Sequence, residues 1–441
     1  MTISIVLQFV VVLAAIWLGA RYSGVGLGLW GAVGLLVLTV VFGVTPTSPP
    51  VDVMLIILAV IMAASVMDAA GGIDFLVRIA ERVIRANPKY ITIVAPLTTW
   101  AFTFVAGTGH IVYPLLPVIY ETAHQNGIRP ERPMAVATIA SQQAITASPV
   151  AAATAAMIGM FSEKGLSQWG LPQILMICVP STLIGVIVAA VIQMFIGKDL
   201  KDDADSQARA KSGAAQPSPA AAERKALPPG AVTSAVIFLI GVALVVIFGF
   251  FPALRHLPGA KEPLAMPLVI EIVMMAVAAV MLAATKVKVD EIPKTATLRA
   301  GVVAVIGIFG LAWLGDSFIA AHQDVIVPGI KAMTEKAPWT FVFGLFFASV
   351  LLYSQAATTR ALMPLGLALG IHPQFLIGAF PSVNGYFFIP TYGTLIAAIN
   401  FDQSGTTKIG KYVLNHSFMI PGLVATSVAV LTGLVLAKLM F

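Results

Sequence analysis

Charge is scarce in this chain. Asp, Glu, Lys and Arg make up 10% of its 441 residues, whereas about 25% is usual for a soluble domain. Hydrophobic residues make up 59% and mean hydropathy is +0.94. Several apolar runs reach the roughly 20 residues that cross a bilayer as a helix. The sequence therefore predicts an all-α polytopic membrane protein. It excludes cytosolic enzymes, secreted disulfide scaffolds and nucleic-acid-binding proteins.

Cysteine is almost absent, since Cys178 is the single one, so no internal disulfide forms. The chain also has no His-Glu-x-x-His motif, no Gly-x-Ser-x-Gly motif and no Cys/His cluster, which argues against an intramembrane enzyme. The first twenty residues have no basic start and no clear cleavage site, so we expect a retained first helix rather than a signal peptide.

Ten long apolar runs predict full membrane spans, with boundaries uncertain by several residues. They cover 3–20, 24–43, 52–70, 133–160, 172–197, 230–251, 264–285, 299–320, 373–400 and 412–440. Two further apolar stretches, about 90–120 and about 338–371, have a polar centre that contains Gly or Thr. Each of these two predicts either one kinked helix or a re-entrant hairpin.

The distribution of basic residues favours two hairpins. With both stretches as hairpins and the N-terminus outside, nineteen of the 26 Lys and Arg residues fall on the inner side and six on the outer side. This split follows the positive-inside rule, and treating either stretch as a single span destroys it. We therefore expect both termini to face outward.

A polar stretch at 198–228, rich in Ala, Ser, Pro and charge, predicts a flexible cytoplasmic linker. It separates two repeats, 1–197 and 229–441, each with five transmembrane helices and one re-entrant hairpin. The first repeat starts outside and the second starts inside. The sequence thus predicts an inverted-topology repeat, which is the plan of many secondary transporters.

Four polar interruptions lie within the apolar segments: the tip at 107–110, the tip at 354–360, Ser148-Pro149, and 382–385. Non-helical backbone at membrane depth survives only where it lines protein or a water-filled cavity. Broken helices also present free N–H groups with partial positive charge, which favour anions. We expect all four to meet in one midplane site, although packing kinks are the simpler explanation for any single one.

Arg360 is the only Lys or Arg placed within a membrane-embedded segment. A cation at mid-depth costs at least about 2.5–3.5 kcal/mol, so Arg360 is a candidate substrate-binding residue. Its planar fork suits a carboxylate. The alternative is that its side chain extends to the outer interface from a shallow hairpin.

His110 could donate to a carboxylate or take up a proton, and a structural role is nearly as well supported. The other residues expected to bind substrate are Thr108, Gly109, Ser141, Gln142, Ser148, Ser354, Gln355, Thr358, Thr359 and Asn384. No cofactor is expected. Na⁺ and H⁺ are both candidates for a coupled ion, and Asp68, Glu271 and Asp316 could each carry it or serve only the structure; Asp68 could instead cap the helix after Gly71-Gly72.

Several long strings resemble the anaerobic C4-dicarboxylate transporter family, the Dcu carriers of bacteria. They are PPVDVMLIILAV, NPKYITIVAP, GTGHIVYPLLPVIYE, NGIRPERPMA, SQQAITASPV, SQAATTRALMPLG and NGYFFIPTYGT. The resemblance covers essentially the whole chain outside the linker. It implies a multi-pass secondary carrier of the bacterial inner membrane that exchanges fumarate, malate or aspartate for succinate, and it leads us to expect a homodimer.

The residues themselves support exchange if Arg360 moves with the site. An empty carrier would then hold an unpaired buried cation, which is costly, so return without substrate would be slow. A dicarboxylate symporter driven by Na⁺ or H⁺ is the alternative, and an organic-anion channel is a weaker one.

Overall fold

The computed structural model describes residues 2–22, 25–203, 226–322, 324, 340–352, 354–410, 412 and 414–441. Within these residues the chain is helical, and an isolated bridge between Ile409 and His416 is the only β-type pairing. Most of the predicted linker, 204–225, lies outside the described residues, as do 338, 339 and 353 of the second predicted hairpin.

The α-helices before the linker are α1 (Thr2–Tyr22), α2 (Gly26–Phe42), α3 (Val51–Ala69), α4 (Gly72–Ala86), α5 (Ile91–Ala106), α6 (Leu116–Gln125), α7 (Glu131–Gln143), α8 (Ala152–Glu163) and α9 (Leu171–Gln193). Those after it are α11 (Ala231–Phe250), α12 (Met266–Thr285), α13 (Ala296–Gly307), α15 (Thr340–Leu352), α16 (Gln355–Ala368), α17 (Pro373–Ala379), α18 (Gly393–Phe401) and α19 (Met419–Met440). Short 3₁₀ segments lie at η1 (Pro88–Tyr90), η2 (Gly109–Leu115), η3 (Ala144–Thr146), η4 (Leu200–Asp202), η6 (Pro252–Arg255), η7 (Val289–Lys294) and η9 (Phe380–Phe387).

Seven helices of the described residues are long and apolar enough to cross a membrane. They are Val51–Ala69, Pro88–Ala106, Leu171–Gln193, Ala231–Phe250, Met266–Thr285, Ala296–His322 and Met419–Met440. Shorter apolar helices cover Ile3–Gly19, Gly26–Phe42 and Thr340–Leu352. The chain is therefore a multi-pass membrane protein.

Two of the ten predicted spans are discontinuous helices. The predicted span 133–160 consists of α7, the 3₁₀ turn η3 and α8, with residues 147–151 outside any helix. The predicted span 373–400 consists of α17, the 3₁₀ segment η9 and α18, and Asn384 inside η9 has non-helical φ and ψ. The first break contains Pro149, and the second contains Pro381 and Gly385. Neither proline nor glycine supports a regular helix interior.

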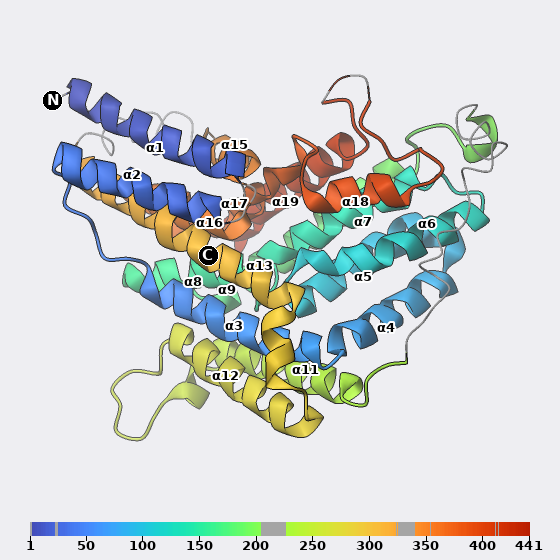
Figure 1. Ribbon diagram of the computed structural model, residues 1–441, viewed down its shortest axis with the longest axis horizontal. Coiled ribbons are helices and arrows are strands. Elements are labelled where there is room, and N and C mark those ends of the chain that lie inside the picture. Colours follow the sequence, from blue (N-terminus) through green and yellow to red (C-terminus); the bar gives the residue numbers. More distant parts are fainter. Residues whose placement is uncertain are drawn as a thin grey trace.

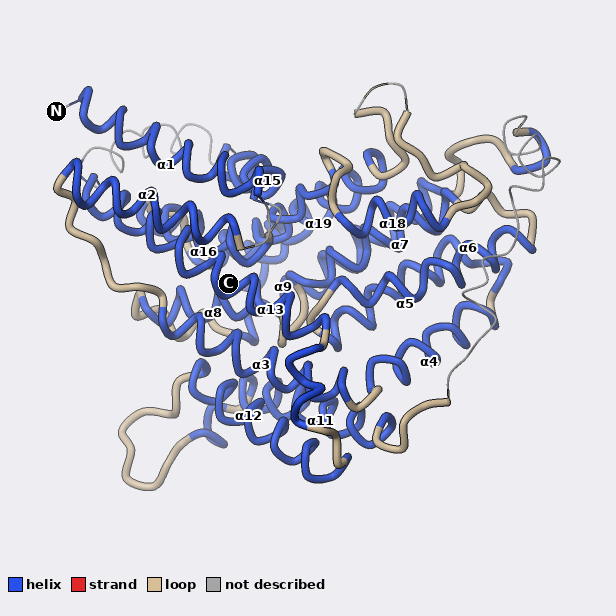
Figure 2. Tube along the Cα trace, in the orientation of Figure 1, coloured by secondary structure: helices blue, strands red, loops and turns tan. Residues whose placement is uncertain are grey.

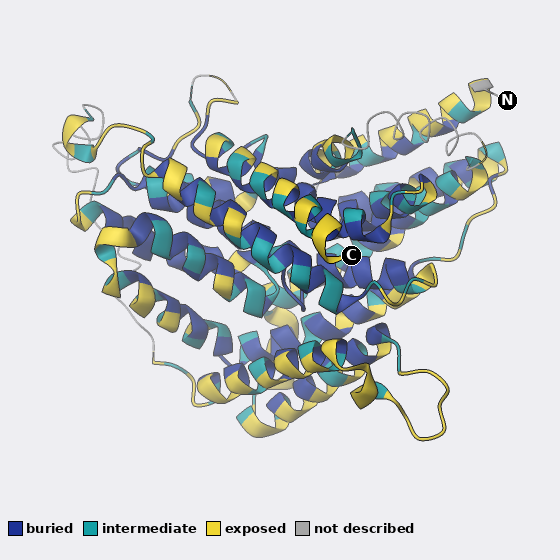
Figure 3. Ribbon diagram, turned by 180° about the vertical axis from the view of Figure 1, so that it is seen from behind, coloured by how far each residue is buried: buried dark blue, intermediate teal, exposed yellow. Residues whose placement is uncertain are grey.

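Apolar side chains cover the outside of the helical assembly as well as its interior. On α2 and α12, Leu36 is 61% exposed and Ile272 is 59% exposed, and Figure 3 shows such exposed positions along the outer faces of the helices. An apolar outer surface is stable against lipid tails and not against water. Longer loops lie at the ends of the helices, including the one between α11 and α12 (Figure 2).

Small residues let several helices approach closely, as is common inside membranes. A Cβ on Gly185 of α9 would lie 2.4 Å from the Ala425 carbonyl oxygen of α19, and a Cβ on Gly310 would lie 1.7 Å from that of Gly28 on α2. Gly310 lies in a π-helical turn, η8 (Ile308–Ala312), within the Ala296–His322 helix. These contacts join helices from before and after the predicted linker, and Figure 1 shows the Ala296–His322 helix running beside α2.

Candidate functional site

The two predicted hairpin tips are breaks in the structure too. Helix α5 ends at Ala106, and the next residue, Gly107, has a left-handed φ of 71°, a conformation that glycine adopts at little cost. Thr108 then caps η2 by accepting a hydrogen bond from the His110 backbone N–H at 3.3 Å. In the second half, Ser354 caps α16 by accepting from the Ala357 N–H at 3.2 Å.

Buried amide side chains link two of the four interruptions, 354–360 and 382–385, to helix α7. Gln355 Nε2 donates to Gln142 Oε1 at 3.1 Å and to Asn384 Oδ1 at 3.2 Å. Asn384 Nδ2 donates in turn to Gln143 Oε1 at 3.2 Å. Gln143 Nε2 then donates to Thr426 Oγ1 of α19 at 2.7 Å. The network therefore ties α7 to the start of α16 and to the break at η9.

The interruption at 107–110 packs against the same network. A Cβ on Gly109 would lie 2.3 Å from Gln142 Nε2, so only glycine leaves room for that amide. Ser148 Oγ donates to the Phe104 carbonyl at 2.7 Å, which joins the break between α7 and α8 to the end of α5. The four interruptions thus converge through these contacts.

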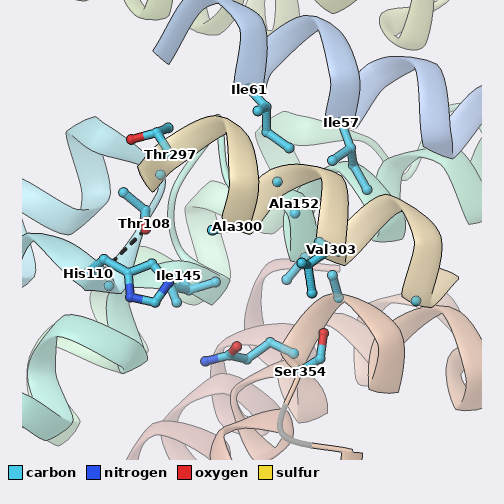
Figure 4. A pocket seen from close by; sticks show the side chains of 18 of the residues that line it. Ile57, Ile61, Thr108, His110, Ile145, Ala152, Thr297, Ala300, Val303 and Ser354 are labelled. Carbon is cyan, nitrogen blue, oxygen red and sulfur yellow. Dashed lines mark hydrogen bonds between the residues drawn. The ribbon is translucent and has the colours of Figure 1, made fainter. Parts of the chain in front are cut away.

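A cavity of about 840 Å³ lies at this convergence. Residues of α3, α8, α13, η2 and the first turn of α16 line it, and Figure 4 shows Thr108, His110, Thr297 and Ser354 around it. Ile57, Ile61, Ile145 and Val303 supply apolar wall. A largely apolar cavity with a few convergent polar groups is the usual form of a small-molecule site.

Six of the predicted site residues line the cavity: Thr108, Gly109, His110, Gln142, Ser354 and Gln355. His110 is exposed there, with its ring stacked on Tyr113 at a centroid distance of 5.8 Å. Asn384 is not a lining residue and reaches the site only through Gln355. Sequence patterns do not separate a residue facing a cavity from one supporting it.

The remaining Ser and Thr residues of the predicted site donate their hydroxyl hydrogen bonds to backbone carbonyls. Ser141 Oγ donates to the Thr138 carbonyl at 2.8 Å. Thr358 Oγ1 and Thr359 Oγ1 donate to the Ser354 and Gln355 carbonyls at 2.8 and 2.7 Å. None of the three lines the cavity, and neither does Ser148. Their hydroxyls satisfy local carbonyls, as Ser and Thr do in membrane helices.

Arg360 differs most from the expectation. It does not line the cavity; its side chain is 4% exposed, and Nη2 lies 2.7 Å from Glu163 Oε2 and 3.2 Å from Asp316 Oδ2. Its charge is therefore paired by carboxylates of the chain rather than presented to the cavity. The argument for exchange from the residues requires that Arg360 has no counterion when the carrier is empty. In this structure Arg360 has two, Glu163 and Asp316.

Sequence reasoning missed the cation that does line the cavity. Arg299, an exposed residue of α13, is the only Lys or Arg among the cavity-lining residues that the structure describes. Its position just before an apolar run makes it look like an ordinary loop charge. Nearby Thr297, also a lining residue, donates through Oγ1 to Asp68 Oδ2 at 2.8 Å. Asp68 does not cap α4, because Gly71 holds that position without a side-chain hydrogen bond.

The two other acidic candidates lie apart from the cavity. Asp316 belongs to the Arg360 ion pair, and Glu271 is a half-exposed residue of α12. Within the described ranges no group of three or more His, Cys, Asp and Glu side chains is placed to hold a metal ion.

The family model of the anaerobic C4-dicarboxylate membrane transporters matches residues 4–441. The chain belongs to this family. It is therefore a member of a transporter family, not of an enzyme family. It is 42% identical over 438 residues to the C4-dicarboxylate transporter DcuA of Escherichia coli K12, covering 99% of this chain and all of that one.

Two other relatives are also named C4-dicarboxylate transporters and align with this chain over nearly their full length. The identity is 39% over 437 residues to the C4-dicarboxylate transporter DcuA of Wolinella succinogenes, with 99% of this chain and 100% of that one covered. It is 38% over 439 residues to the anaerobic C4-dicarboxylate transporter DcuB of Escherichia coli O6:H1, with 98% of each covered.

One solved structure shares the fold. MtrF of Neisseria gonorrhoeae, described with a class of antimetabolite efflux pumps, superposes with a TM-score of 0.52 over 92% of this chain and 84% of its own. The sequence identity is 14%, so this likeness supports the polytopic helical fold and no statement about the transported molecule.

Proposed function

We propose that this protein carries C4-dicarboxylates across the bacterial inner membrane by binding them in the cavity between the two halves of the chain. The observation that carries the proposal is the cavity lined by the interruptions at 107–110 and 354–357, in a chain whose relatives are named C4-dicarboxylate transporters. Fumarate, malate, succinate and aspartate are the substrates we propose from the family resemblance.

The lining residues suit a dianion. Arg299 supplies a permanent positive charge whose planar fork fits a carboxylate. Thr108, Ser354 and the amides of Gln142 and Gln355 supply neutral polar groups, and the first turn of α16 supplies helix N–H groups with partial positive charge. Such contacts replace the water that a carboxylate loses on entering the cavity.

We propose alternating access by an inverted-topology repeat as the mechanism. Apart from α4, the helix order of 1–197 parallels that of the described residues of 229–441, and each half holds one break between two short helices and one discontinuous helix. In this mechanism the stretches 90–120 and 338–371 are re-entrant hairpins, and both termini face the periplasm. Movement of part of each repeat against the rest then exposes the cavity to one side at a time.

Exchange of one dicarboxylate for another is the transport mode we propose, and its support is the family resemblance, since Arg360 is paired. Counterflow of labelled succinate in proteoliposomes tests it. Uptake should require internal dicarboxylate and should be unchanged by Na⁺ and by a pH gradient. Fast net uptake driven by either ion into vesicles without internal substrate would instead establish symport, and non-saturable flux would establish a channel.

Arg299→Gln tests the site itself. Loss of one charge-assisted contact, worth about 1.5–3 kcal/mol, should raise the apparent KM for succinate by about tenfold to a hundredfold. Arg299→Lys should recover part of this loss. Lys261→Gln, in the exposed loop between α11 and α12, is the matched control and should leave KM unchanged. An unaltered KM in Arg299→Gln would remove Arg299 from the site.

The same resemblance leads us to propose a homodimer, which native mass spectrometry of the detergent-solubilised protein tests. A monomer would contradict it without affecting the proposed substrate.

A further inference from the structure

One buried arginine joins three helices beyond the cavity. Arg360 on α16 contacts Glu163, the last residue of α8, and Asp316 of the Ala296–His322 helix, both through Nη2. The arginine side chain is 4% exposed, and the carboxylate side chains are 25% and 18% exposed. We call Arg360, Glu163 and Asp316 the triad. Its members come from both sides of the predicted linker.

The same three helices also line the cavity, through residues that precede the triad along each helix. Lining residues are 354–357 at the start of α16, 152, 153 and 155 at the start of α8, and residues up to Gly307 of the Ala296–His322 helix. Arg360 is one helical turn past Ala357 on the same face. Glu163 and Asp316 are eight and nine residues past their helices' last lining residues, about 12–14 Å along a helix.

In this arrangement, ion pairs connect the helices at one end of the cavity and, within the described residues, not at the other. At the Arg299 end, Ala296 and Arg299 of α13 are exposed. At the other end, the ion pairs of the buried Arg360 connect α8, α16 and the Ala296–His322 helix. For the cavity to open at that end, these three helices have to separate, and the contacts of Arg360 with the two carboxylates have to break.

We propose that the triad is an ion-pair gate that closes the cavity at the end remote from Arg299, with Glu163 and Asp316 acting as internal counterions of Arg360. This inference rests on the proposed function in so far as a carrier must expose its cavity alternately. It gives the buried arginine a role in access instead of in substrate binding, and it assigns a transport role to two carboxylates that line no part of the cavity.

The geometry ranks the three side chains. Loss of Arg360 leaves two carboxylates facing each other with no cation between them, so Arg360→Gln should open the gate most. Glu163 lies closer to Nη2 than Asp316 does, at 2.7 against 3.2 Å, so Glu163→Gln should exceed Asp316→Asn. Arg360→Lys keeps a charge and should restore part of the closure. If the triad served stability alone, these substitutions would lower the stability of the protein without changing the side of the membrane from which the cavity is accessible.

Thiol labelling measures the access directly. Cys178 is the only cysteine in the sequence and is buried, so Cys178→Ser gives a cysteine-free background. Ala300→Cys on α13 places a reporter in the cavity wall (Figure 4). A membrane-impermeant maleimide is then applied to membrane vesicles of each orientation.

With an intact triad, the reporter should label from one face only. Arg360→Gln should raise labelling from the other face by about tenfold, the size of a shift of roughly 1.4 kcal/mol between closed and open states. Glu271→Gln, which removes a half-exposed carboxylate of α12 outside the triad, should change nothing. Equal labelling from both faces with the triad intact, or unchanged one-sided labelling in a folded Arg360→Gln protein, overturns the proposal.

The result is separable from the substrate assignment. Protection of the reporter by succinate tests the proposed function, whereas the side of labelling tests the gate without any dicarboxylate present. Size-exclusion profiles and unfolding temperatures of each variant establish that the labelled protein is folded.

Discussion

Buried amides hold the centre of this protein together at the scale of single residues. Asn384 is fully buried, and its side chain lies between Gln355 and Gln143. An amide offers both donors and an acceptor, so one residue can bridge two others from different helices. Hydrogen bonding of this kind fixes how the breaks meet, which apolar contacts alone specify less sharply.

Asn384→Ala should therefore both destabilise the protein and impair transport. It leaves Gln143 Oε1 and one donor of Gln355 without their partner, at a cost of about 1–3 kcal/mol for each unsatisfied group. Thermal unfolding in detergent and succinate counterflow measure the two effects. Asn400→Ala, on the exposed face of α18, should have little effect on either. Wild-type stability in Asn384→Ala would show that the network contributes nothing.

His416 gives the segment between α18 and α19 a dependence on pH. Its Nδ1 accepts from the Phe418 N–H at 3.2 Å, and Nε2 lies 3.4 Å from the Phe388 carbonyl oxygen. Burial lowers the pKa of His416 below its ordinary value of 6.5, and the hydrogen bond to Phe388 opposes this only in part. The folded protein thus favours the neutral ring, which donates through Nε2.

Stability should fall as the pH drops below about 6.5, because the unfolded chain takes up a proton that the folded chain resists. Above that value both states hold a neutral ring and the effect vanishes. Unfolding temperatures measured between about pH 7.5 and about pH 5.5 check this. His416→Gln should flatten the slope, whereas His256→Gln, in the exposed loop after α11, should keep it. An unchanged slope in His416→Gln would assign the effect to another group.

Glycine decides how closely helices approach at the scale of elements. Helix α2 crosses the Ala296–His322 helix where Gly28 faces Ile306 and Gly310; a Cβ on Gly28 would lie 1.9 Å from the Ile306 carbonyl oxygen. The π-helical turn Ile308–Ala312 falls at this crossing. Backbones in such contact gain dispersion and weak polar interactions that a side chain would prevent.

Gly310→Ala should separate these two helices, because its Cβ would lie 1.7 Å from the Gly28 carbonyl oxygen. Overpacking of this kind costs about 1–3 kcal/mol and often more where backbone must move. Gly344→Ala in α15 is the control, since nothing lies within 4 Å of its Cβ, and it should be neutral or stabilising by up to about 1 kcal/mol. The unfolding temperature should therefore fall in Gly310→Ala and stay the same or rise in Gly344→Ala; equal changes in the two variants would contradict the close crossing.

At the scale of the whole molecule, a bound dicarboxylate should stabilise the fold, because its site uses side chains from distant parts of the chain. A ligand at a hundred times its Kd adds about 2.7 kcal/mol to the folded state. Succinate should therefore raise the unfolding temperature more than butyrate, which has four carbons and one carboxylate. Arg299→Gln should reduce the difference. Equal stabilisation by the two acids would contradict a dianion site.

The sequence predicted much of this architecture from particular residues. The breaks at Gly107-Thr108, Ser148-Pro149, Ser354 and Asn384-Gly385 are where the apolar pattern admits Gly, Pro and capping residues, and the structure has breaks at all four. Their convergence was expected because non-helical backbone at membrane depth is stable only where it is buried in protein or lines a water-filled cavity. Single-residue roles were harder to predict. Arg360 and Arg299 illustrate this. The position of an arginine in the sequence does not indicate whether a carboxylate lies beside it or whether it lines a cavity.

By itself, the sequence determined the membrane environment, the helical fold class, the positions of the interruptions and the family. These properties depend on hydropathy, on local backbone preferences and on motif strings, all of which are local in the chain. Only the tertiary structure decided that Glu163 and Asp316 neutralise Arg360, that Arg299 lines the cavity, and that Gln142, Gln355 and Asn384 form one network. Those contacts join residues up to 213 positions apart, and helix packing, not sequence proximity, brings them together.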